Sequence, residues 1–188
     1  FHSEKQYDKL EIRLRKQRFC CVIGDSARGK SRFVENYFSR KNISHFVRFD
    51  GDTSYSLHNS VKQFIKKLQG ERRNELIKND MNALTIELKR LLKEKKQAYY
   101  FLIDNDNPEN KENSHFIRLL LRDDMKPYRR AVIVIVQRTK SSENYKKYEK
   151  PGLGLGAITI TLARNKMKDA LSNTFKKLEE KEKVIKLK

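Results

Sequence analysis

FCCVIGDSARGKS, residues 19–31, is the stretch of this sequence that decides the fold. It opens with a continuous apolar run, Phe19 to Ile23, which is typical of a parallel strand buried on both faces. Gly24 and Gly29 then enclose a polar turn, and residues 31–39 carry apolar side chains at helical spacing. The stretch therefore predicts a strand, a glycine turn and a helix in direct succession.

The glycine turn matches the pattern G-x-x-x-x-G-K-[ST] in full. Glycines let the backbone curl so that successive N–H groups face phosphate oxygens, and the following helix adds its positive N-terminal end. Lys30 is expected along the β- and γ-phosphates, and Ser31 is expected to offer its hydroxyl to Mg²⁺. The predicted nucleotide-binding residues are Gly24, Asp25, Ser26, Ala27, Arg28, Gly29, Lys30, Ser31 and Arg32.

A site for ATP or ADP with Mg²⁺ also needs a carboxylate at the end of a neighbouring strand. Asp104 ends the apolar run 98–103 and is predicted to supply it, so Ser31 and Asp104 are the predicted metal ligands. Asn105 follows where a second acid would activate water. Because an amide cannot act as a general base, we expect slow ATP hydrolysis unless Asp106 or a distant carboxylate substitutes.

Residues 131–136 are the clearest strand in the chain, and Arg138 follows them closely. If that strand neighbours the first one, a cation at this point would lie beside the γ-phosphate and could report which nucleotide is bound. Lys30, Asp104 and Arg138 therefore form the predicted catalytic set. A surface position for Arg138 is the alternative.

Strand-like runs alternate with helical patterns along the whole chain, which favours an α/β fold with helices on both faces of a parallel sheet. Further strands are predicted at residues 44–50, 98–103 and 157–162, helices at 57–68, 114–122 and 165–178, and one or two helices over residues 72–96. We expect a nucleotide-binding domain over residues 1–162. Residues 163–188 are expected to form the start of a helical lid or a charged tail.

The chain is strongly basic, with 43 Lys and Arg against 24 Asp and Glu and a formal net charge of +19 over 188 residues. Such a charge attracts nucleic acid and other polyanions, but a merely solvated basic surface remains the alternative. Cys20 and Cys21 are neighbours on a strand, point to opposite faces and read as core residues of a reducing compartment. No apolar stretch reaches the length of a membrane span, so a cytoplasmic, intracellular protein is expected.

The order of these features resembles the STAND class of signal-transduction ATPases, which includes the NB-ARC and NACHT switch domains and the MalT-like regulators. Phe1, Glu4, Tyr7 and Leu10 resemble a degenerate form of its entry motif, without the usual Gly-Arg pair. Residues 47–50, 101–104, 134–138 and 158–162 are similar to its later strands, including the strand that ends in an arginine sensor.

The resemblance implies a three-layer α-β-α sandwich with a five-stranded parallel sheet in the order 5-1-4-3-2. It also implies a switch in which ADP holds a closed state and ATP favours self-association, with effector or sensor modules outside this chain. The strongest rival is an AAA+-like ATPase that acts on DNA, as a replication or transposition loader does, although such proteins normally have Glu where Asn105 stands. A small GTPase and a small-molecule kinase fit less well, because no guanine-selecting motif or arginine-rich lid insert is present.

Overall fold

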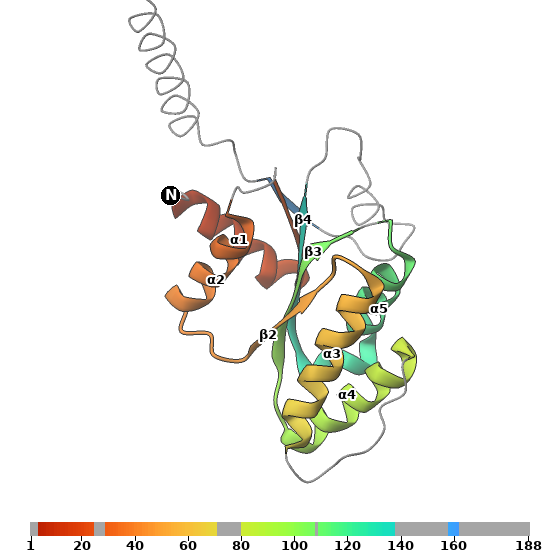
Figure 1. Ribbon diagram of the computed structural model, residues 1–188. Helices are drawn as coiled ribbons and strands as arrows, with labels where there is room; N and C mark the ends of the chain where they lie inside the picture. The colour runs from red at the N-terminus through yellow and green to blue at the C-terminus, as the bar shows by residue number, and fades with distance from the viewer. Residues whose placement is uncertain (1–3, 25–28, 71–79, 108, 138–157, 162–188) are drawn as a thin grey trace, which may run out of the picture.

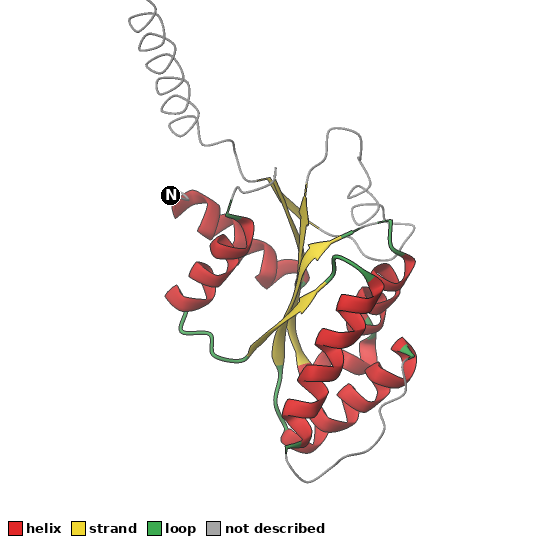
Figure 2. Ribbon diagram, viewed as in Figure 1, coloured by secondary structure: helices red, strands yellow, loops and turns green. Residues whose placement is uncertain are grey.

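The computed structural model describes residues 4–24, 29–70, 80–107, 109–137 and 158–161. Helices and strands alternate through these residues, as Figures 1 and 2 show. In chain order they are α1 (Glu4–Gln17), β1 (Phe19–Gly24), α2 (Lys30–Arg40), β2 (Phe46–Asp50), α3 (Ser54–Gln69), α4 (Met81–Lys95), β3 (Tyr99–Asp106), α5 (Lys111–Leu121), the 3₁₀ helix η1 (Asp123–Tyr128), β4 (Arg129–Gln137) and β5 (Ile158–Thr161).

The strands form one parallel sheet in the order β2-β3-β4-β1-β5. The predicted neighbour relations among β1, β4, β3 and β2 are confirmed. β1 pairs with β4 from Phe19↔Val132 to Gly24↔Gln137, and β2 pairs with β3 as far as Asp50↔Asp104. β5 is a short strand beside β1. All of these strands therefore end at the same edge of the sheet, where the predicted site residues were expected.

Helices cover the sheet on both sides, α1 and α2 on one face and α3, α4 and α5 on the other (Figure 1). Each side has its own core of buried apolar residues, because successive side chains of a strand point to opposite faces. Cys20 belongs to the core under α1 and α2, whereas Cys21 belongs to the core under α3, α4 and α5. Both thiols are buried, as the sequence predicted, and they are not joined in a disulfide.

Side-chain caps fix where the helices on the second face begin. Thr53 and Ser56 form a capping box at the start of α3, in which each side-chain oxygen accepts a hydrogen bond from the other residue's backbone N–H at 3.0 Å. Asp80 accepts a hydrogen bond from the N–H of Ala83 at 2.9 Å and so caps α4. These caps therefore fix the first turns of α3 and α4.

The bounds of several elements differ from the sequence prediction by a few residues. β3 continues beyond Asp104 to Asp106, because its pairing with β4 shifts between Ile103 and Asp106 in a β-bulge that carries the strand onward. Of the one or two helices expected over residues 72–96, the structure describes α4, and residues 71–79 lie outside the described part. The helix predicted at 165–178 and the lid or tail at 163–188 also lie outside it. Within the described part, no helix is both long and apolar enough to span a bilayer.

Candidate functional site

The ends of the phosphate loop are in place at the carboxyl edge of the sheet. Gly24 is the last residue of β1, and Gly29 stands just before α2 with φ 69° and ψ 30°, a left-handed conformation that glycine adopts without strain. Within the described residues no side chain caps the N-terminus of α2. Its first N–H groups and the positive end of its dipole therefore suit an anion. Asp25, Ser26, Ala27 and Arg28 lie outside the described residues.

Lys30 connects the two ends of the loop. Its ammonium group donates a hydrogen bond to the backbone carbonyl of Gly24 at 3.0 Å, and the side chain is half-buried. The ammonium group is thus held over the end of β1, on the side from which the loop begins. Arg32, one turn into the same helix, is exposed. The contact of Lys30 with bound phosphate stays a prediction.

Asp104 lies beside Ser31, although the two residues are far apart in the sequence. The Ser31 hydroxyl donates a hydrogen bond to Oδ1 of Asp104 at 3.0 Å, and the backbone N–H of Asn105 donates to the same oxygen at 2.9 Å. Asp104 is only 1% exposed. The predicted pair of metal ligands is therefore brought together by the parallel sheet and held in a buried position.

The other carboxylate oxygen of Asp104 bears on whether a cation can bind here. Oδ2 is buried and makes no directed hydrogen bond, although the Arg48 guanidinium contacts it as an ion pair. A carboxylate oxygen next to a serine hydroxyl is the kind of oxygen donor set that Mg²⁺ prefers. Ser31 and Asp104 therefore fit Mg²⁺ that arrives with a nucleotide.

Arg48 is a site residue that the sequence pattern did not single out. It lies in β2, and its guanidinium contacts both Asp104 and Glu35, the second at 3.0 Å. An arginine in an alternating strand looks like an outward-facing surface residue. The strand order and the register Asp50↔Asp104 bring it to Asp104, and neither can be read from local sequence.

The bulge at the end of β3 decides which side chains surround Asp104. Asn105 adopts a left-handed conformation with φ 52° and is exposed. Asp106 is buried, and its Oδ1 accepts a hydrogen bond from Asn113 Nδ2 at 2.8 Å. The same amide nitrogen donates to the carbonyl of Gly51 at 2.6 Å. Asp106 is thus engaged in a buried contact and is poorly placed to replace the missing second acid.

Arg138 lies outside the described residues. The prediction for Arg138 required the strand before it to neighbour the first strand. This holds, because β4 pairs with β1 and the last residue of β4, Gln137, pairs with Gly24. Its role as a sensor of the γ-phosphate stays a prediction.

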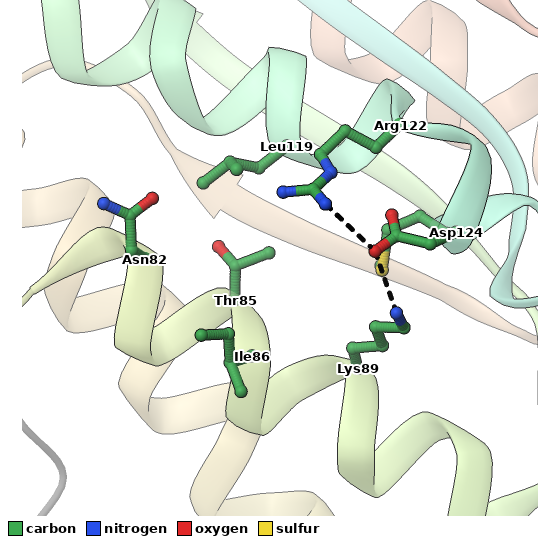
Figure 3. A pocket seen from close by; sticks show the side chains of 8 residues that line it. Asn82, Thr85, Ile86, Lys89, Leu119, Arg122 and Asp124 are labelled. Atoms are coloured by element: carbon green, nitrogen blue, oxygen red, sulfur yellow. Dashed lines mark hydrogen bonds and ion pairs between the residues drawn. The ribbon is translucent and has the colours of Figure 1, made fainter.

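A small cavity lies elsewhere, between α4 and the segment formed by α5 and η1 (Figure 3). Its volume of about 80 Å³ is well below the roughly 300 Å³ at which small-molecule pockets begin. An ion pair between Lys89 and Asp124, at 2.8 Å, closes one end. The lining residues are Asn82, Thr85, Ile86, Lys89, Leu119, Arg122, Asp124 and Met125. The cavity is too small for a nucleotide and is not a candidate for this site.

The strand order, the lysine over the end of β1 and the Ser31–Asp104 pair together define the P-loop class of nucleotide-binding folds. No protein-family model and no curated protein sequence matches the chain.

Three solved structures are similar to it. Cdc6p from Pyrobaculum aerophilum has a TM-score of 0.62 at 16% identity, over 85% of this chain and 45% of that one. The Walker-type ATPase PABY2304 of Pyrococcus abyssi has a TM-score of 0.53 at 14% identity, over 95% and 59%. The Aeropyrum pernix ORC1 protein in complex with DNA has a TM-score of 0.56 at 13% identity, over 86% and 45%.

At these identities the likeness shows the fold, which is that of P-loop ATPases. The chain spans only about half the length of these proteins, 45% of the first and 59% of the second. None of the three solved structures named above is described as a STAND protein, so the resemblance to the STAND class is not confirmed.

Proposed function

We propose that this chain is the nucleotide-binding domain of an AAA+-like ATPase that acts on DNA, and that it binds ATP or ADP with Mg²⁺. The observation that carries nucleotide binding is the contact of the Ser31 hydroxyl with buried Asp104, beside an uncapped helix N-terminus. A bound nucleotide would supply phosphate to the loop and bring Mg²⁺ to Asp104. Lys30 would then exchange its bond to Gly24 for a phosphate oxygen.

Two observations favour a DNA-acting protein over a signalling switch. The solved neighbours include a Cdc6p and an ORC1 protein in complex with DNA, and the chain has a net charge of +19. In the described part, exposed lysines lie on both helical layers, for example Lys5 and Lys9 on α1 and Lys66 and Lys67 on α3. The charge thus supports attraction to a polyanion without marking one face as the contact.

A STAND-type switch is the second candidate, with self-association in the ATP state and modules outside this chain. Asn105 favours it, because an exposed amide beside Asp104 gives slow turnover and leaves the bound nucleotide in place. In that case, ATP and ADP would shift a conformational equilibrium by their different affinities for the two states.

The nucleotide site is tested by Lys30→Ala. Removing a charge-assisted bond to phosphate should weaken binding of a fluorescent ATP analogue about 100-fold, as measured by fluorescence anisotropy. Lys89→Ala is the matched control, since Lys89 pairs with Asp124 far from the loop and its loss should leave the affinity unchanged. Equal affinity of Lys30→Ala and the unsubstituted chain would refute the site.

The DNA-acting function is tested by a gel-shift series in increasing salt, with and without ATP. Purely electrostatic attraction falls by orders of magnitude between about 50 and 200 mM salt when six or more phosphates are contacted. DNA affinity that survives this range and depends on ATP supports the proposed function. DNA binding that vanishes at moderate salt, together with tight ADP binding, would favour the switch instead.

A further inference from the structure

Arg48 lies between two carboxylates that belong to different parts of the site. Phe46 packs on Phe38 of α2, at 4.7 Å between ring centroids, so this face of β2 looks toward α2. Arg48 points to the same face because it is two residues further along the strand. One guanidinium nitrogen contacts Glu35 of α2, and the other contacts Oδ2 of Asp104.

The two carboxylates differ sharply in exposure. The side chain of Asp104 is 2% exposed, whereas that of Glu35 is 43% exposed. A buried carboxylate without a cation is unfavourable, so Asp104 depends on its counter-ion far more than Glu35 does. Mg²⁺ bound to Asp104 would also supply positive charge to this carboxylate. Arg48 and Mg²⁺ would therefore compete for Asp104.

Arg48 is also able to leave. Its side chain is 48% exposed, and its contact with Glu35 at 3.0 Å uses a different guanidinium nitrogen from its contact with Asp104. Mg²⁺ would thus displace Arg48 from Asp104, while Glu35 would hold it nearby.

We propose that Arg48 is a tethered counter-ion that neutralises Asp104 in the metal-free domain and competes with Mg²⁺ for it. This inference rests on the proposed binding of nucleotide with Mg²⁺. With Mg²⁺ at Asp104, Arg48 would keep only its contact with Glu35, whereas without the metal it contacts both carboxylates. Arg48 thereby sets how strongly nucleotide binding depends on Mg²⁺ and keeps the buried acid paired while the site is empty of metal.

The test compares the affinity for fluorescent ADP in Mg²⁺ with that in EDTA. Arg48→Gln removes the competitor and should raise the ratio of the two affinities about fivefold, the range expected for a half-exposed ion pair. Glu35→Gln should lower the ratio, because Arg48 then loses the partner that draws it from Asp104. Arg48→Lys keeps the charge but cannot contact both carboxylates, and its ratio should fall between those of Arg48→Gln and the unsubstituted chain.

Arg90→Gln is the matched control. Arg90 pairs with Glu87 and Glu94 on α4, on the other face of the sheet, and its substitution should leave the ratio unchanged. An unchanged ratio in Arg48→Gln, with normal binding by the unsubstituted chain, overturns the inference but not the proposed function. An equal loss of affinity in Mg²⁺ and in EDTA also overturns it, since Arg48 would then contact phosphate directly.

A second measurement needs no nucleotide. Mg²⁺ alone should raise the melting temperature of Arg48→Gln more than that of the unsubstituted chain, because the variant leaves Asp104 without a counter-ion. An equal rise in both proteins would contradict competition. This arm decides the role of Arg48 even if the unsubstituted chain fails to bind ADP, a result that would refute the proposed function separately.

Discussion

Gly51→Ala tests how tightly the end of β2 is packed against the strand that carries Asp104. A Cβ at Gly51 would stand 2.9 Å from Ile103 Cγ2, 3.1 Å from Asp106 Cα and 3.2 Å from Asn113 Nδ2. The backbone of Gly51 also donates a hydrogen bond to the carbonyl of Asp104 at 2.7 Å. The new methyl group therefore meets atoms that cannot move independently of the site.

The magnitude follows from these contacts. Overpacking of this kind costs roughly 1–3 kcal/mol. Asn113 is fully buried and donates to both Gly51 and Asp106, so pushing it aside adds about 1–2 kcal/mol for a weakened buried hydrogen bond. We expect a loss of about 3 kcal/mol in the free energy of unfolding, or a drop of about 6–12 °C in melting temperature.

Urea unfolding followed by circular dichroism measures the loss, with Gly70→Ala as the control. Gly70 has φ 69° and nothing within 4 Å of an added Cβ, so its substitution costs only the backbone term, about 1 kcal/mol. The double variant Gly51→Ala, Asn113→Ala should be less destabilised than the sum of the two single variants. A loss no larger for Gly51→Ala than for Gly70→Ala would refute the packing argument.

Two further predictions concern the rate of hydrolysis and alkaline pH. Asn105→Glu supplies the missing acid and should raise the rate of ATP hydrolysis about 100-fold in a phosphate-release assay. Because residue 105 has a left-handed backbone conformation, the substitution should also lower the free energy of unfolding by about 1 kcal/mol. An unchanged rate would mean that another step limits turnover. Burial raises the pKa of the Cys20 thiol from 9.0 to about 12 and that of the Tyr37 hydroxyl from 10.0 to about 12. In the unfolded chain these two groups lose their protons at a lower pH than in the folded protein, so the free energy of unfolding should fall as pH rises from about 9 toward 12. A melting temperature that is constant over this range would contradict this prediction.

Local pattern was enough to predict the strands, the two ends of the loop and the Ser31–Asp104 pair. The apolar run before Gly24 and the run before Asp104 each mark a buried parallel strand, and such strands end at one edge of the sheet. Once both runs are identified, the meeting of a loop serine and a strand-end aspartate follows from the fold. The contact of Ser31 with Asp104 at 3.0 Å could therefore be predicted from the sequence.

Other parts of the site depend on relations between distant residues. Arg48 reaches Asp104 through the pairing of β2 with β3, and Asp106 is drawn inward by Asn113 of α5. The bulge after Ile103 also shifts the alternation of side chains, so the roles of Asn105 and Asp106 could not be separated by counting positions. No local signal encodes strand register or a bulge, and these features had to come from the structure.

The adjacent thiols of Cys20 and Cys21 can report separately on the opening of the two helical layers. Because one thiol is buried under α1 and α2 and the other under α3, α4 and α5, each can meet an alkylating reagent only when its own helical layer opens. Mass spectrometry of the single peptide that holds both would compare the two opening rates within one molecule. Loss of protection at Cys20 alone, on addition of nucleotide, would locate the motion in the layer formed by α1 and α2.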